Sequence, residues 1–104
     1  MFIHGYEAVG RGALNAGCTH FFGYPITPQN EITEFFAREL PKRGGRFVQA
    51  ESESSSASMV FGAALAGVRA MTSTASPGWG LMQEILSHIS MCELPCVVVN
   101  VQRG

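Results

Sequence analysis

Residues 22–29, which read Phe-Gly-Tyr-Pro-Ile-Thr-Pro-Gln, decide the fold of this chain. The apolar residues before Gly23 are typical of a strand that ends there. Pro25 and Pro28 cannot donate backbone hydrogen bonds, so the segment between them is expected to be a rigid turn. Thr27 stands where a helix N-cap belongs, and Pro28 suits the first helical position. The stretch therefore predicts a strand, a stiff loop and the start of a helix, which is where open α/β sheets bind ligands.

The rest of the chain repeats this alternation of helix and strand. The apolar patterns predict helices near residues 5–16, 28–40, 54–67 and 76–89, and strands near residues 19–22, 47–50, 68–72 and 97–101. Such alternation indicates a parallel sheet covered on both faces, so we predict a three-layer, doubly wound α/β fold. The β-branched run Val97–Val101 is typical of a central strand. Because no helix follows this run, we expect residues 1–104 to be the N-terminal part of a domain whose continuation is missing.

Composition and charge narrow the classes of function. The chain has 104 residues, of which 46% are hydrophobic and 14% charged, and its net charge is −1. This charge gives no electrostatic attraction for nucleic acid or an anionic membrane surface. No apolar stretch reaches the roughly 18 residues of a membrane span, and the N-terminus lacks the features of a signal peptide. Cys18, Cys92 and Cys96 are odd in number and lie among apolar residues, which indicates reduced thiols and a cytoplasmic protein.

Polar residues follow each predicted strand at the point where the strand ends. These segments are residues 24–28, 51–53, 73–78 and 100–103. Because parallel strands run in one direction, their carboxyl ends lie at one edge of the sheet, and the four segments are expected to meet there. Convergent polar groups of this kind are typical of a binding site. We therefore place the candidate site at this edge.

Several side chains in these segments have two interpretations on the residues alone. Glu51 and Glu53 are carboxylates that stabilise the start of the next helix, or carboxyl groups that exchange a proton with the ring nitrogen of a ligand. Arg103 is a surface residue, or a guanidinium that binds a carboxylate through two hydrogen bonds. Thr27 is a helix cap or a ligand contact, and one hydroxyl group can be both.

Several motifs, taken in order along the chain, resemble one known family. They are Gly23-Tyr24-Pro25-Ile26-Thr27-Pro28, Gln49-Ala50-Glu51-Ser52-Glu53, Ser76-Pro77-Gly78, and Glu93-Leu94-Pro95-Cys96 with Val101-Gln102-Arg103-Gly104. Together they resemble the alpha subunit of the 2-oxoacid:ferredoxin oxidoreductases. The likeness is nearest to the type that acts on 3-methyl-2-oxobutanoate, with the 2-oxoglutarate type close behind. It implies that residues 1–104 are the N-terminal part of a pyrimidine-binding thiamine diphosphate domain.

The resemblance also implies roles for individual residues. Glu53 matches the glutamate that hydrogen-bonds N1′ of the aminopyrimidine ring, so it is both a cofactor contact and the expected catalytic residue. Tyr24 and Pro25 match the loop expected at the cofactor. Thr27 and Arg103 match residues that bind the substrate, Arg103 through the substrate carboxylate. Tyr6 departs from the pattern, because the family usually has asparagine at that position.

The same resemblance implies that this chain is not active alone. It would share thiamine diphosphate with a beta subunit that carries the diphosphate-binding domain. Magnesium and iron–sulfur clusters are expected on partner subunits, and gamma and delta subunits would complete the complex. The implied reaction is oxidative decarboxylation of a 2-oxoacid, with coenzyme A accepting the acyl group and ferredoxin the electrons. Besides 3-methyl-2-oxobutanoate, the alternative substrates are 2-oxoglutarate and pyruvate.

Two other classes of protein would keep a fold of this kind. One is a non-catalytic assembly module of a multisubunit complex, and the other is a flavodoxin-like domain that binds a nucleotide or a flavin. Neither class needs a carboxyl group and a guanidinium group at the same edge of the sheet. The pair Glu53 and Arg103 therefore favours the oxidoreductase subunit over both alternatives.

Overall fold

A parallel sheet forms the centre of the computed structural model, which describes residues 2–102. The strands are β1 (His20–Gly23), β2 (Arg46–Gln49), β3 (Ala70–Ala75) and β4 (Val97–Val101). They lie in the order β2-β1-β3-β4, and all neighbouring strands pair in parallel. Each strand overlaps its predicted range, so the predicted parallel sheet is confirmed.

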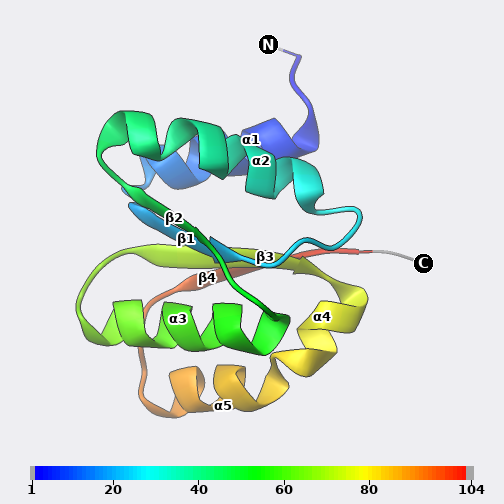
Figure 1. The fold of residues 1–104 in the computed structure, drawn as a ribbon. Coiled ribbons are helices and arrows are strands. Elements are labelled where there is room, and N and C mark those ends of the chain that lie inside the picture. Colours follow the sequence, from blue (N-terminus) through cyan, green and yellow to red (C-terminus); the bar gives the residue numbers. More distant parts are fainter. Residues whose placement is uncertain (1, 103–104) are drawn as a thin grey trace.

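Helices cover both faces of this sheet (Figure 1). On one face lie α1 (Gly5–Asn15) and α2 (Asn30–Glu39), and on the other lie α3 (Glu53–Leu65) and α5 (Gln83–Met91). The short helix α4 (Ser76–Leu81) follows the end of β3, and the 3-10 turn η1 (Pro41–Arg43) leads from α2 towards β2. The three-layer α/β prediction is confirmed. Within residues 2–102, every helix is too short or too polar to cross a membrane.

Two neighbouring phenylalanines of β1 show how the sheet supports a core on each face. Successive side chains of a strand point to opposite faces. Phe21 is fully buried on the side of α2, where its ring stacks on Phe36 with centroids 4.6 Å apart. Phe22 belongs to a second apolar cluster with Val60 of α3 and Ile89 of α5. The sheet is thus held between two apolar layers.

The start of α2 differs from the prediction made for Thr27. The helix begins at Asn30, and the residue before it is Gln29. A turn precedes the helix, closed by a hydrogen bond from the Gln29 backbone N–H to the Ile26 carbonyl oxygen at 2.9 Å. The Thr27–Pro28 peptide bond inside this turn is cis. Pro28 therefore lies in a turn and not in the helix, and the prediction that Thr27 is the N-cap is wrong.

The last two strands differ from their predictions in extent and position. β3 continues past its predicted end at Thr72, because Thr74 and Ala75 still pair with β4. β4 lies at an edge of the described sheet and not at its centre, and its Val97 is 56% exposed. A β-branched run favours the extended backbone whatever its neighbours are, so it predicts a strand without predicting how many strands flank it.

The predicted helix over residues 76–89 is divided in the structure. Met82 separates α4 from α5 and is almost fully buried, at 1% exposure. Its backbone N–H still donates to the carbonyl oxygen of Gly78 at 3.1 Å, so α4 closes as a short helix of its own. The break turns the chain away from the end of β3 and brings α4 over the start of α3, which it contacts.

Candidate functional site

The carboxyl ends of the strands bring the predicted site segments to one edge. Gly23, the last residue of β1, pairs with Gln49, the last residue of β2. Beyond this pair the Ala50 backbone N–H donates to the Gly23 carbonyl oxygen at 2.8 Å. The loop that begins at Tyr24 and the segment that begins at Glu51 therefore leave the sheet side by side. β3 and β4 end at the same edge, on the right of Figure 1.

Glu53 is a buried carboxylate at this edge. It is the first residue of α3 and is only 8% exposed. The helix begins there because the Ser52 Oγ accepts a hydrogen bond from the Ser55 backbone N–H at 3.1 Å, which caps the first turn. Within residues 2–102, the Glu53 carboxylate has no hydrogen-bond or ion-pair partner. Its oxygens are not among the fully buried side-chain atoms that lack a partner, so they keep some exposure at this edge. The carboxylate is therefore open to a hydrogen bond from a ligand.

A glycine of α4 forms the wall next to Glu53. A Cβ atom built on Gly78 would lie 2.8 Å from the Glu53 Cγ and 2.0 Å from the Thr74 Oγ1. Real Cβ atoms essentially never approach other atoms so closely, so a side chain at position 78 would have to displace one of them. Gly78 is itself buried. The absence of a side chain at this position therefore lets α4 pack directly over Glu53 and the end of β3.

Glu51 lies near Glu53 in the sequence but in a different environment. Its side chain is exposed, and its Oε1 accepts a hydrogen bond from the Ser55 Oγ at 2.8 Å. The chain turns into the helix at Ser52, which separates the two carboxylates. Glu51 therefore fits the interpretation of a carboxylate that stabilises the start of α3, where the helix dipole favours negative charge.

The loop after β1 presents three of the predicted site residues to solvent. Tyr24 is 36% exposed, and Pro25 and Thr27 are also exposed. All three lie at the same edge as Glu53. Arg103, the other predicted substrate contact, lies outside the described residues.

Two polar residues beneath this loop were missed by the sequence prediction. Gln29 is fully buried and bonds to the loop, to α2 and to β3. Ser73 was assigned to a loop but is a buried residue of β3 whose Oγ donates to the Gln29 Oε1. Glutamine is mostly found exposed and serine is common in turns, so no local signal indicated that these two residues are buried.

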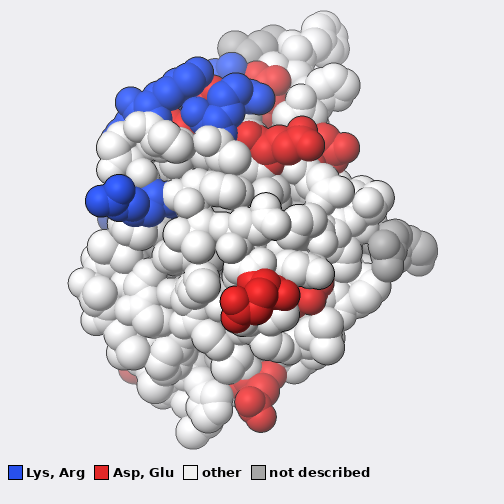
Figure 2. Space-filling view, in the orientation of Figure 1, with Lys and Arg blue, Asp and Glu red and all other residues white. Residues whose placement is uncertain are grey.

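The positive charges of the described residues lie mostly at the opposite end of the sheet (Figure 2). Lys and Arg side chains gather on the left of Figure 2, near the end of α2 and the start of β2, where the strands begin. They include Arg38, Lys42, Arg43 and Arg46. The described residues that follow the strand ends contain no Lys or Arg. Positive charge for an anionic ligand at the candidate edge must therefore come from outside residues 2–102.

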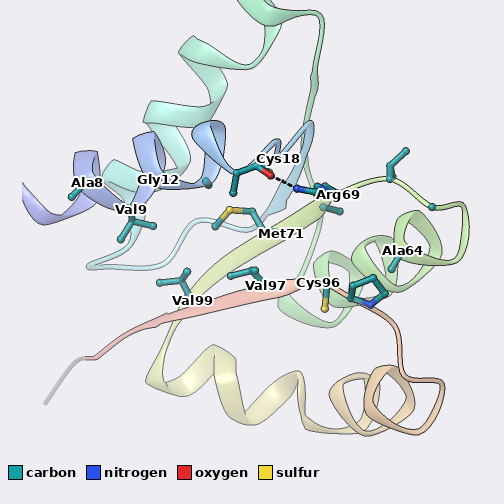
Figure 3. Close-up of a pocket in the computed structure, with 16 residues that line it drawn as sticks. Ala8, Val9, Gly12, Cys18, Ala64, Arg69, Met71, Cys96, Val97 and Val99 are labelled. Carbon is teal, nitrogen blue, oxygen red and sulfur yellow. Dashed lines mark hydrogen bonds between the residues drawn. The ribbon is translucent and has the colours of Figure 1, made fainter.

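A cavity of about 720 Å³ lies away from the candidate site. It lies at the starts of β3 and β4, between α1 and the end of α3, and is lined mainly by apolar side chains (Figure 3). Cys18 and Cys96 line it, and burial raises the pKa of both thiols, so they are poor nucleophiles near neutral pH. Residues 2–102 contain no group of three or more His, Cys, Asp or Glu side chains placed to bind a metal ion.

The sequence matches a known family over most of its length. Residues 11–104 match the family described as pyruvate flavodoxin/ferredoxin oxidoreductase, thiamine diphosphate-binding. The chain is 52% identical over 103 residues to the 2-oxoglutarate synthase subunit KorA of Methanocaldococcus jannaschii, covering 99% of this chain and 28% of that protein. It is 50% identical over 104 residues to the ketoisovalerate oxidoreductase subunit VorB of Methanothermobacter marburgensis, covering all of this chain and 30% of that protein.

The fold also matches a solved structure closely. That structure is the 2-oxoglutarate:ferredoxin oxidoreductase of Magnetococcus marinus with 2-oxoglutarate, coenzyme A and succinyl-CoA bound. The two superpose with a TM-score of 0.96 at 48% sequence identity, over 98% of this chain and 18% of the other. The chain thus spans less than a third of the length of these relatives.

Proposed function

The chain belongs to the thiamine diphosphate-binding family of the pyruvate flavodoxin/ferredoxin oxidoreductases, and we propose that it forms part of the alpha subunit of a 2-oxoacid:ferredoxin oxidoreductase. In this role it contributes one wall of a site for oxidative decarboxylation of a 2-oxoacid to an acyl-CoA. One observation carries the proposal: Glu53 is a largely buried residue whose carboxylate has no partner within residues 2–102, and it lies at the edge of the sheet where ligands bind.

The residues at this edge fit an aminopyrimidine ring. Thiamine diphosphate, when bound, supplies a carbon nucleophile that takes up the electrons released by decarboxylation. The Glu53 carboxylate would hold the ring nitrogen N1′ through a hydrogen bond and would share the proton between them. Because Gly78 has no side chain, α4 packs closely against the Glu53 Cγ.

The loop after β1 supplies the contacts on the other side of the ligand. In this proposal Tyr24 and Pro25 pack against the cofactor, and the Thr27 hydroxyl binds the substrate. Arg103 binds the substrate carboxylate, which would provide the positive charge that the described part of this edge lacks. The exposure of Tyr24, Pro25 and Thr27 at this edge supports these roles.

The proposed substrate is a 2-oxoacid, and the two favoured candidates are 3-methyl-2-oxobutanoate and 2-oxoglutarate. The relatives named above act by name on 2-oxoglutarate and on ketoisovalerate, and a pyruvate synthase subunit of Thermotoga maritima is 41% identical to this chain. The motifs of the chain favour 3-methyl-2-oxobutanoate, which is ketoisovalerate, with 2-oxoglutarate as the alternative and pyruvate after them. Turnover of the three acids by the assembled enzyme, compared at equal concentrations, decides among them.

The relatives are named as subunits, which supports a role for this chain within a complex. We propose that a beta subunit binds the diphosphate and magnesium, that gamma and delta subunits complete the assembly, and that partner subunits hold the iron–sulfur clusters. Ferredoxin then accepts the electrons, and coenzyme A accepts the acyl group.

The proposal is tested by Glu53→Gln in the full-length chain, assembled with its partner subunits. Glutamine keeps the shape of the side chain but replaces the carboxylate with an amide, which cannot exchange a proton. Thiamine-dependent decarboxylation is therefore expected to fall at least a hundredfold, within the range of general acid–base effects. Assembly, followed by size-exclusion chromatography, is expected to be unchanged. Glu51→Gln is the matched control, since Glu51 is exposed at the same edge, and it is expected to keep full activity. Full activity of Glu53→Gln would reject the assigned role.

A further inference from the structure

Gln29 is the most completely bonded polar side chain near the candidate site. It has no exposed surface. Its Nε2 donates to the Tyr24 carbonyl oxygen at 2.9 Å. Its Oε1 accepts from the Thr33 Oγ1 at 2.8 Å and also from the Ser73 Oγ. The side-chain amide therefore connects the loop, α2 and β3. It donates one hydrogen bond and accepts two, a combination that an ionised carboxylate or a hydrocarbon side chain of similar length cannot make.

The same residue holds the loop at two points. The side chain bonds to the Tyr24 carbonyl at the start of the loop, and the backbone N–H bonds to the Ile26 carbonyl in the middle, each at 2.9 Å. Tyr24, Pro25 and Thr27 are exposed and belong to neither apolar cluster of the protein. The position of the loop relative to β3 consequently depends on the buried amide of Gln29.

We infer that Gln29 is a positioning residue, which holds the loop of residues 24–28 at the distance from β3 at which Thr27 meets the substrate. This inference rests on the proposed function, because it assigns the loop to that site. Gln29 does not itself touch a ligand, since its side chain is buried beneath the loop. Its effect on the reaction passes through Tyr24 and Thr27.

Two substitutions break the bond to the loop in different ways. Gln29→Glu keeps the shape and still accepts from Thr33 and Ser73, but an ionised carboxylate cannot donate to the Tyr24 carbonyl. Gln29→Met is uncharged and of similar length, and it removes all three side-chain bonds. In that variant the Thr33 hydroxyl can turn to the carbonyl oxygen of residue 29, one helical turn earlier. If the buried charge of Gln29→Glu prevents folding, Gln29→Met still tests the role of the bond to the loop.

Thr33→Val is the matched control. It removes one hydrogen bond from the same amide on the side of the helix, is nearly equal in shape, and leaves the bond to Tyr24 intact. If the network has a purely structural role, the change in KM follows the loss of thermal stability in the same way in Thr33→Val and in the Gln29 variants. A positioning role predicts that only the Gln29 variants change the kinetics for the 2-oxoacid.

The experiment uses the full-length chain in its assembled complex. Loss of the hydrogen bond to the Tyr24 carbonyl is expected to raise the KM for the 2-oxoacid about tenfold in both Gln29 variants, with a smaller change in kcat. Amide hydrogen exchange of the peptide that contains the loop is expected to become about tenfold faster. Because Pro25 and Pro28 carry no amide hydrogen, this signal comes chiefly from Tyr24, Ile26 and Thr27.

The outcomes separate this inference from the proposed function. An unchanged KM and unchanged exchange in Gln29→Met would overturn the positioning role. An equal rise of KM in Thr33→Val would overturn it as well, because that variant keeps the bond to the loop. A wild-type complex that turned over no 2-oxoacid would overturn the proposed function and, with it, the role of the loop in binding the substrate. The exchange measurement would then still show whether Gln29 holds the loop in place.

Discussion

Replacement of Gly78 by alanine tests the packing that places Glu53. The added Cβ would lie 2.0 Å from the Thr74 Oγ1 and 2.8 Å from the Glu53 Cγ. Thr74 is 1% exposed and belongs to β3, which is paired with β4, so it has little room to move. Relief of the contact must therefore come from displacement of α4 or of the Glu53 side chain.

The size of the effect follows from two opposing terms. Overpacking of a well-filled site costs about 1–3 kcal/mol. Alanine in place of glycine inside a helix returns up to about 1 kcal/mol. The overpacking term dominates, so the free energy of unfolding is expected to fall by about 1–2 kcal/mol. A displacement of Glu53 by part of an ångström is expected to lower kcat/KM for the 2-oxoacid on the order of tenfold to a hundredfold.

Gly80→Ala is the matched control for this change. Gly80 lies in the same helix, but a Cβ there would meet nothing within 4 Å. This variant is expected to keep full activity and to gain a few tenths of a kcal/mol or more in stability from helix propensity. Urea unfolding and steady-state decarboxylation of the full-length complex measure both quantities. Identical behaviour of the two alanine variants would refute the close packing of α4 over Glu53.

Two further predictions concern the core and the thiols. Phe36→Ala removes a fully buried ring that stacks on Phe21, and a loss of about 3–5 kcal/mol in the free energy of unfolding is expected from urea titration; a loss below about 1 kcal/mol would contradict the assigned core. Because burial raises the pKa of Cys18 and Cys96, their thiolates form only at higher pH than usual, so iodoacetamide at pH 8 is expected to label the exposed Cys92 first. Labelling in the opposite order, read by mass spectrometry, would show that the two thiols are not protected.

Local patterns predicted the element types well because each is set by neighbouring residues. The apolar run at Phe21 and Phe22 indicated a strand, and the stripe that includes Phe35 and Phe36 indicated a helix. The alternation of these elements then indicated a parallel sheet with its ligand edge at the strand ends. The position of β4 could not be predicted in this way. Val97–Val101 favours a strand by its β-branched residues, but the number of its neighbours depends on other parts of the chain.

The predicted site residues divide in the same way. The sequence placed Tyr24, Pro25, Thr27 and Glu53 at the edge where the structure has them, because topology alone brings them there. It misassigned Thr27 as a helix cap, because a threonine followed by proline is the usual start signal of a helix. In the structure a turn separates Thr27 from the helix, and a backbone hydrogen bond from Gln29 to Ile26 closes that turn.

The sequence by itself determined that the chain alternates helix and strand and that its polar segments meet at one end of a parallel sheet. These properties follow from the periodicity of apolar residues and from the common direction of parallel strands. Both can be inferred from the order of residues along the chain. Only the tertiary structure decided that Glu53 is buried while Glu51 is exposed, and that Gln29 lies beneath the loop. Burial depends on which distant segment arrives over a residue: Gly78 covers Glu53, and Ser73 reaches Gln29. No spacing within the chain encodes these contacts, because they form only when the layers pack.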